Sequence, residues 1–273
     1  MKKLLLPLLS ILLLTDCKKE VTTITPQEEI ASATANKQTK LFVCHYDAVT
    51  GTSKTIEVDQ SALVGHLAHG DVQGECIQTT TICNQVWMVK NLDVTTYRNG
   101  DIIPQVTDQA EWNALTTGAW CYYENNSANG PVYGKLYNWY AANDPRGLAP
   151  TGWHVPTSDE WAIVSDCLGG DFVAGGKMKS VGTIEAGTGL WHDPNTDATN
   201  SSGFTGLPGG LRLVDAGFGF ERIGNYGLWW TSTAHPIENN FIFYRMLFRD
   251  PPFILQGYMF KEAGLSVRCV KDN

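Results

Sequence analysis

The sequence predicts an α+β fold that is rich in loops. Strand-like runs of aromatic and β-branched residues fill the last third of the chain, whereas only two or three segments show helical periodicity. The chain has 27 glycines and nine tryptophans but only 18% charged residues, which indicates many turns anchored by large aromatic side chains. A mixture of strands with a few helices is typical of the α+β class and argues against a helical bundle.

Length and charge limit the classes of function. A chain of 273 residues with 43% hydrophobic residues is long enough for one large domain and a small one. The formal net charge is −8, and lysine and arginine form no long basic run. Nucleic acid is therefore not an expected partner.

Residues 1–17 have the features of an export signal. Two lysines precede the apolar run Leu4–Leu14, which is too short for the ~20 residues of a spanning helix. The run ends in L-T-D-C, which resembles the bacterial lipobox, although Asp16 stands where a small residue is usual. We expect Cys17 to become the acylated N-terminus and to anchor the protein in a membrane, since each buried CH₂ contributes ~0.8 kcal/mol. The alternative is an ordinary signal peptide with an incidental cysteine.

Residues 18–40 are expected to form a flexible tether. They are rich in Thr, Gln, Glu, Ala and Lys and contain no aromatic residue. Such a segment cannot bury enough apolar surface to order itself. The tether would separate the following domains from the membrane.

Residues 41–76 are predicted to form a separate small unit. Strands are expected at Leu41–Tyr46 and Thr55–Val58 around a turn near Gly51, followed by a helix at Ser61–His69. The unit resembles a short C-H…H-L-x-H-G-D-x-x-G-x-C module that occurs in other secreted bacterial proteins.

The cysteines and histidines of this unit suggest a zinc site. His66 and His69 share one helix face, and Cys44 and Cys76 would arrive from the flanking segments as thiolates. His45 follows Cys44 directly, so on a strand it would point the other way. The alternative is a Cys44–Cys76 disulfide, which would stabilise the unit by roughly 3–4 kcal/mol and is favoured outside the cytoplasm. A disulfide combined with a histidine-only metal site also remains open.

Residues 77–273 are predicted to form the main domain. Its most clearly marked element is a helix at Thr157–Leu168, where Thr157 and Glu160 form a capping box. Trp161 and Val164 begin an apolar face that continues to Leu168. A short helix is expected at Thr107–Leu115, a helix or tight turn at Gly134–Ala142, and mostly loops from the end of the capped helix to Gly227. Strands are expected at Thr79–Cys83, Val86–Leu92, Ala119–Tyr123, Leu228–Thr233, Phe241–Phe248, Ile254–Phe260 and Leu265–Val270.

Six separated motifs of the main domain closely resemble the Fibrobacter succinogenes major paralogous domain. The resemblance covers roughly residues 78–273 and implies an extracellular domain related to C-type-lectin-like folds and to formylglycine-generating enzymes. The motifs are Q-V-W-M-V-K-N-L at Gln85–Leu92, G-K-L-Y-N-W-Y at Gly134–Tyr140, P-R-G-L-A-P-T-G-W-H-V-P-T-S-D-E-W at Pro145–Trp161, G-F-T-G-L-P-G-G at Gly203–Gly210, W-W-T-S-T at Trp229–Thr233 and V-R-C at Val267–Cys269.

The resemblance also bears on the cysteines and on catalysis. By analogy with C-type-lectin-like folds, we expect the disulfides Cys83–Cys121 and Cys167–Cys269. Formylglycine-generating enzymes hold copper between two nearby cysteines in the C-terminal region. No cysteine lies between Cys167 and Cys269 in this chain, so the required thiolates are missing and a non-catalytic domain is expected.

The sequence therefore favours a surface lipoprotein, anchored to the outer membrane of the cell envelope, that binds an extracellular glycan or protein. The rival hypothesis is a structural or assembly scaffold of the cell surface. Trp229 and Trp230 are adjacent in a predicted strand, so their rings must point to opposite faces and one of them could offer a platform for a sugar. The polar rim of such a site would come from Asn225, Tyr226, Asn239 and Asn240.

Overall fold

A computed structural model of the chain describes residues 40–214 and 219–272. These residues divide into two compact units, the first ending at Cys76 and the second beginning at Ile77. The predicted export signal, the lipid anchor Cys17 and almost all of the tether lie outside the described residues. Within the described ranges, no helix has the length and apolar character needed to cross a membrane.

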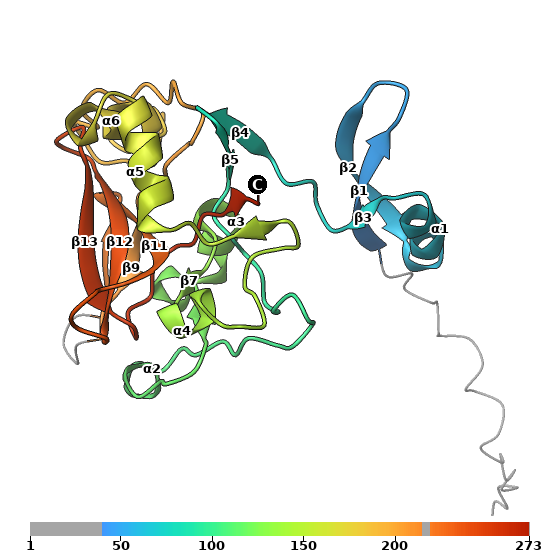
Figure 1. Cartoon of the computed structure of the whole chain (residues 1–273), viewed down its shortest axis with the longest axis horizontal. Helices are drawn as coiled ribbons and strands as arrows, with labels where there is room; N and C mark the ends of the chain where they lie inside the picture. The colour runs from blue at the N-terminus through green and yellow to red at the C-terminus, as the bar shows by residue number, and fades with distance from the viewer. Residues whose placement is uncertain (1–39, 215–218, 273) are drawn as a thin grey trace, which may run out of the picture. The chain divides into compact units, whose positions relative to one another are not determined.

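The first unit is a three-stranded antiparallel sheet with one short helix (Figure 1). Its strand order is β2-β1-β3, with β1 at Lys40–Asp47, β2 at Thr52–Asp59 and β3 at Val72–Gln73. The predicted strands are confirmed and are longer than expected, whereas the predicted helix is divided into a 3-10 turn, η1 (Gln60–Ala62), and α1 (Leu63–Ala68). Val43 and Val58 are the buried hydrophobic side chains of residues 40–76. A unit with so small a core needs further stabilisation, for example from a disulfide or a metal ion.

The second unit contains four small sheets whose strands pair in antiparallel fashion. The four-stranded sheet has the order β4-β5-β14-β8, the three-stranded sheet is β11-β12-β13, and two further pairs are β6-β7 and β10-β9. Bounds are β4 (Thr79–Ile82), β5 (Gln85–Met88), β6 (Trp120–Cys121), β7 (Leu136–Tyr137), β8 (Trp153–His154), β9 (Gly209–Arg212), β10 (Phe220–Ile223), β11 (Tyr226–Ala234), β12 (Phe241–Phe248), β13 (Ile254–Phe260) and β14 (Val270–Lys271).

Short helices connect and cover these sheets. Of these, α5 contacts β11 and β12, and α6 contacts β13, so the two helices lie against the β11-β12-β13 sheet (Figure 1). The mixed α+β class that the sequence predicts is confirmed. Bounds are α2 (Gln109–Asn113), η2 (Tyr123–Asn125), η3 (Ser127–Asn129), α3 (Gly130–Tyr133), α4 (Trp139–Ala142), α5 (Ser158–Cys167) and α6 (Asp171–Met178).

The capping box of α5 is confirmed. The Thr157 hydroxyl accepts a hydrogen bond from the Glu160 amide at 3.2 Å, and the Glu160 carboxylate accepts one from the Thr157 amide at 2.8 Å. These two bonds satisfy backbone N–H groups that have no partner within the helix. The predicted apolar face is also confirmed, because Trp161 and Val164 are fully buried.

We expect Thr157→Ala to lower the free energy of unfolding by ~1 kcal/mol, because the helix loses its N-cap acceptor. Urea denaturation followed by tryptophan fluorescence measures this loss. Thr157→Ser is the matched control, since it keeps the hydroxyl and should stay within about 0.5 kcal/mol of the wild type. Equal losses in both variants would contradict a capping role.

Trp161 belongs to a cluster of stacked aromatic rings in the core. Its ring centroid lies 4.7 Å from that of Trp87 and 5.5 Å from that of Phe204, and Trp229 completes the cluster. All four side chains are fully buried. Tilted and edge-to-face pairs of this kind add to the stabilisation from buried area. The capped helix is therefore tied to β5 and β11 through aromatic side chains.

The segment after α5 differs from the expectation of mostly loops. It contains α6, β9 and β10. Helix α6 includes Gly175 and Gly176, which disfavour a helix in a sequence-based prediction. Both glycines are required by packing: a Cβ at Gly175 would lie 2.2 Å from the carbonyl oxygen of Phe253, and one at Gly176 would lie 2.6 Å from that of Asp197.

Several other predicted elements are shorter than expected, among them the strand expected at Val86–Leu92, which ends at Met88. The helix expected at Thr107–Leu115 is α2, which begins after the N-cap Asp108. The strand expected at Ala119–Tyr123 is limited to β6. Of the strand expected at Leu265–Val270, only Val270 lies in a strand, β14. In that last segment the backbone forms isolated bridges with Tyr137 and Trp229 instead of a continuous ladder.

The predicted disulfide pairing of the main domain is wrong. The structure joins Cys83 to Cys167, whereas Cys121 and Cys269 are buried and unpaired among the described residues. Cys83 lies at the tip of the β4–β5 hairpin, where its φ of 58° allows a two-residue turn. This tip meets the C-terminal end of α5, with a Cα–Cα distance of 6.5 Å that suits a disulfide.

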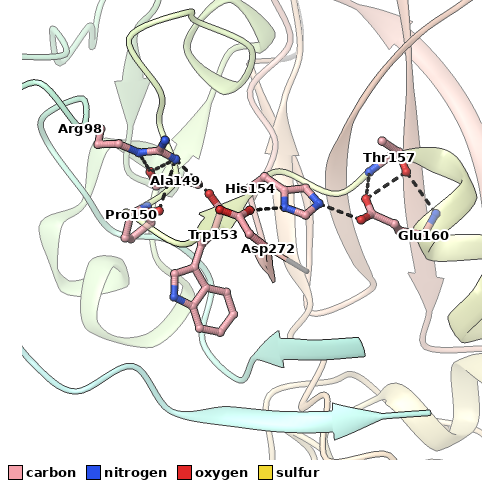
Figure 2. A network of polar contacts seen from close by, with 8 residues as sticks. All are labelled: Arg98, Ala149, Pro150, Trp153, His154, Thr157, Glu160 and Asp272. Atoms are coloured by element: carbon pink, nitrogen blue, oxygen red, sulfur yellow. Dashed lines mark hydrogen bonds and ion pairs between the residues drawn. The ribbon is translucent and has the colours of Figure 1, made fainter. Parts of the chain in front are cut away.

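His154 connects the start of α5 to the end of the chain (Figure 2). Its Nδ1 and Nε2 atoms contact Asp272 and Glu160, each at 2.7 Å. His154 itself lies in β8. Burial works to lower the pKa of His154, but the hydrogen bonds to Asp272 and Glu160 outweigh it and raise that pKa above 6.5.

This contact makes stability depend on pH. The raised pKa of His154 means that its contribution is fully present below about pH 6.5 and is lost as the pH rises through the folded-state value. We expect the free energy of unfolding to fall as the pH rises above about 6.5, by less than about 1 kcal/mol because the side chain is partly exposed. Urea midpoints at several pH values measure the fall. His154→Gln should abolish it, whereas the control His192→Gln should retain it.

Candidate metal centre

Four side chains of the first unit converge on one point. Nδ1 of His45, Nδ1 of His66 and Nε2 of His69 donate to the same oxygen of Asp71, at 2.8, 2.7 and 3.0 Å. Potential ligand atoms of these four residues all lie within 4.8 Å of one another. The group is thus compact enough to hold a metal ion.

The fold of the unit explains this convergence. His45 lies on β1, and the pairing of Cys44 with Val72 on β3 continues to place Asp71 opposite His45. His66 lies in the last turn of α1 and His69 directly after it, so both project from the same end of the helix. Gly70, at φ 98°, then turns the chain so that Asp71 leads into β3.

Asp71 is the buried centre of the cluster. Its side chain is 1% exposed, and its second oxygen accepts a hydrogen bond from the Tyr46 amide at 3.0 Å. Burial works to raise the pKa of the Asp71 carboxyl, but hydrogen bonds from His45, His66 and the Tyr46 amide outweigh it and hold that pKa well below its usual range. The carboxylate is therefore charged and fixed in orientation, as metal ligands usually are.

The predicted zinc ligands Cys44 and Cys76 are wrong, because the two residues form a disulfide. Cys44 and His45 are neighbours on β1 and therefore point to opposite faces. Cys44 joins the disulfide on one face, and His45 joins the histidines on the other. Of the alternative that combined a disulfide with a histidine-only metal site, the structure shows the disulfide, and the histidines form a cluster that also includes Asp71 and could hold a metal.

His66 and His69, which the sequence placed together as candidate ligands, both belong to this cluster. The sequence prediction misses His45 and Asp71, although the motif H-L-x-H-G-D contained the signal: a glycine at positive φ directly before an aspartate returns the chain toward the helix end. The prediction considered thiolates first and so passed over the carboxylate.

Three imidazoles and one carboxylate form a ligand set suited to zinc. Calcium and magnesium prefer sites made only of oxygen. Zinc bonds of 2.0–2.2 Å in a tetrahedron set neighbouring ligand atoms roughly 3.4 Å apart. The nitrogen–oxygen distances of 2.7–3.0 Å would have to lengthen by about half an ångström, which small side-chain rotations supply.

The aromatic platform predicted at Trp229 and Trp230 does not form. The two rings do point to opposite faces of β11, but both are fully buried, in different core clusters. Their N–H groups donate inward, Trp229 to the Asn91 side chain at 2.8 Å and Trp230 to the Tyr137 carbonyl at 2.8 Å. The remaining tryptophans are buried as well, except Trp139, which is half-buried.

The predicted polar rim is divided between two places. Asn225 and Tyr226 lie at the start of β11, whereas Asn239 and Asn240 follow its end. A strand of nine residues spans roughly 27–30 Å, so these two pairs cannot surround one ligand.

Residues from several of the six sequence motifs contact one another inside the core. The side-chain oxygen of Asn91 accepts hydrogen bonds from Trp229 at 2.8 Å and from Arg268 at 2.7 and 3.0 Å. Arg268 is fully buried and also donates to the carbonyls of Met88 and Phe204. A buried guanidinium is tolerated only when such partners surround it. These motif residues therefore hold distant segments together.

The two units define an α+β protein with a disulfide-closed Cys/His module and a larger, aromatic-rich domain. Residues 80–271 match the family model described as the Fibrobacter succinogenes major domain, so the chain belongs to that family. No curated protein and no solved structure matches the chain.

Proposed function

We propose that this chain is a lipid-anchored binding protein of the cell envelope, exposed at the outer membrane, whose N-terminal module holds a zinc ion. The observation that supports zinc is the convergence of His45, His66 and His69 on the buried carboxylate of Asp71. Four protein ligands fill the coordination sphere that zinc prefers, so the ion is held in place and does not activate a water molecule.

The zinc ion would also complete an undersized fold. The module has little buried apolar surface, and its Cys44–Cys76 disulfide supplies one covalent cross-link. A metal bound by His45 of β1, by His66 and His69 at the end of α1, and by Asp71 before β3 would join these three elements. Binding energy for such an ion is also folding energy.

Zinc titration of the full chain tests this proposal. We expect one equivalent to bind, with weaker binding in acid because protons compete for the imidazoles. Cobalt substituted for zinc should give a tetrahedral spectrum without thiolate-to-metal charge transfer, since both cysteines of the module are in a disulfide. Failure to bind either metal would overturn the proposal.

The second unit, which begins at Ile77 and carries the family match, is called the family domain below. For it we propose a non-catalytic, C-type-lectin-like binding domain whose partner is an extracellular glycan or protein. Support comes from the family match and from the small antiparallel sheets, of which β11-β12-β13 packs against α5. The buried tryptophans favour the alternative of a surface scaffold, because they stabilise the core and leave no tryptophan platform at β11.

Lipid anchoring at Cys17 has a direct test. Cys17→Ser should move the protein from the membrane fraction to the soluble fraction, because the acceptor for the acyl chains is lost. Fractionation followed by immunoblotting measures the change, with Cys121→Ser as a control that keeps the lipobox. Unchanged membrane association of Cys17→Ser would contradict anchoring through this residue.

A further inference from the structure

A hollow of about 730 Å³ opens in the surface of the family domain beside the turn between β10 and β11. Its lining comes from three parts of the chain: η2, the segment from β10 to the first residue of β11, and the residues that follow β12. This volume falls within the range of small-molecule sites. The predicted ligand residues Asn225 and Tyr226 both line it.

Aromatic rings form part of the wall. The centroids of Tyr123 and Phe220 lie 5.4 Å apart, and Tyr226 packs edge-to-face against Phe248 at 5.3 Å. These contacts fix the orientation of the rings. Tyr123 is only 5% exposed, so the faces on which the C–H groups of a sugar can pack come from the partly exposed rings of Phe220 and Tyr226.

Polar groups stand beside these rings. Arg222 has a left-handed backbone with φ 72°, which is uncommon for a residue with a long side chain. Its guanidinium lies 5.1 Å from the Tyr226 centroid and pairs with Glu221 at 3.3 Å. The strained backbone and these two contacts hold the guanidinium at the hollow, which is the pre-organisation that a binding site requires.

The charges of the hollow are balanced. The guanidinium groups of Arg222 and Arg249 are accompanied by the carboxylates of Glu221 and Asp250, and Asn225 adds an amide. A phosphate or a polyanionic chain would meet as much repulsion as attraction in such surroundings. Closely spaced donors and acceptors of both signs instead suit a neutral ligand with many hydroxyl groups.

We infer that this hollow binds a neutral saccharide, with the aromatic wall contacting the sugar ring and Asn225 and Arg249 bonding its hydroxyls. The inference rests on the proposed binding role of the family domain and gives that role a ligand class and a location. It is independent of the zinc ion, which belongs to the other unit.

Binding of the full chain to an array of neutral, carboxylated and sulfated oligosaccharides tests the inference. We expect neutral glycans to bind, and Asn225→Ala and Arg249→Ala each to weaken that binding at least about tenfold, the equivalent of 1.4 kcal/mol. Arg146→Ala is the matched control, because this partly exposed arginine pairs with Asp144 and Asp101 outside the hollow. Circular dichroism shows that each variant is folded.

The outcomes separate the inference from the broader proposal. Neutral glycan binding that survives both substitutions in folded protein would overturn the hollow as the site but keep the family domain as a glycan-binding domain. A preference for sulfated or carboxylated glycans would overturn the ligand class. The absence of any glycan binding would overturn the inference entirely, and capture of a specific extracellular protein would then keep the binding role.

Discussion

Replacing His66 with alanine is expected to weaken zinc binding to the full chain by about 100-fold or more. His66 makes the shortest of the three contacts to Asp71, at 2.7 Å, and its loss removes one of four ligands. Even residues that only orient metal ligands change affinity by about 10–100-fold when they are mutated. Isothermal titration with zinc measures the change, and competition with a chelator extends the measurement to tight binding.

Asp71→Asn provides a second, more conservative test. The amide keeps the size of the carboxylate but removes the negative charge that faces three imidazoles. We expect a similar loss of zinc affinity, because the metal then has only neutral ligands.

Two control variants test whether zinc binding depends on the proposed ligands alone. His192 lies in the family domain, where it forms a hydrogen bond with Glu185. His192→Ala should therefore leave the zinc affinity unchanged. Cys44→Ser combined with Cys76→Ser removes the disulfide but no proposed ligand, so the one-to-one stoichiometry should persist at reduced stability. Loss of zinc in the cysteine variant, together with full binding by His66→Ala, would contradict the ligand set.

Replacing Trp161 with alanine is expected to lower the free energy of unfolding of the family domain by ~3–5 kcal/mol. Trp161 is fully buried between Trp87, Phe204 and Trp229, so its removal leaves a cavity that the surrounding rings cannot fill. Because a typical domain is stable by only about 5–15 kcal/mol, the variant should be close to unfolding.

Urea denaturation followed by tryptophan fluorescence measures this effect. All nine tryptophans lie after residue 77, so the signal reports on the family domain and not on the first unit. Ile163→Ala is the matched control on the same helix, since Ile163 is 44% exposed and its loss should cost well under 1 kcal/mol. Equal stability of the two variants would show that Trp161 does not anchor the helix.

Local signals in the sequence determined the elements that depend on near neighbours. The capping box at Thr157 and the apolar face of Trp161 and Val164 identified α5, because cap and face are set by residues within two turns. The long strands β11, β12 and β13 were predicted within a few residues for the same reason. The sequence motifs also identified the family.

Only the tertiary structure decided which distant groups meet. Cys83 pairs with Cys167 because a hairpin tip reaches the end of a helix, and α6 tolerates Gly175 and Gly176 because other backbone segments press against it.

The candidate metal centre likewise depends partly on local spacing and partly on tertiary structure. The spacing of His66 and His69 placed them on one helix end, which is a local property. His45 and Asp71 joined them through the register of β1 and β3, and Cys44 was directed to the opposite face by the alternation of a strand. The ligand set was therefore decided by strand pairing between residues 26 positions apart, which periodicity within a single segment cannot report.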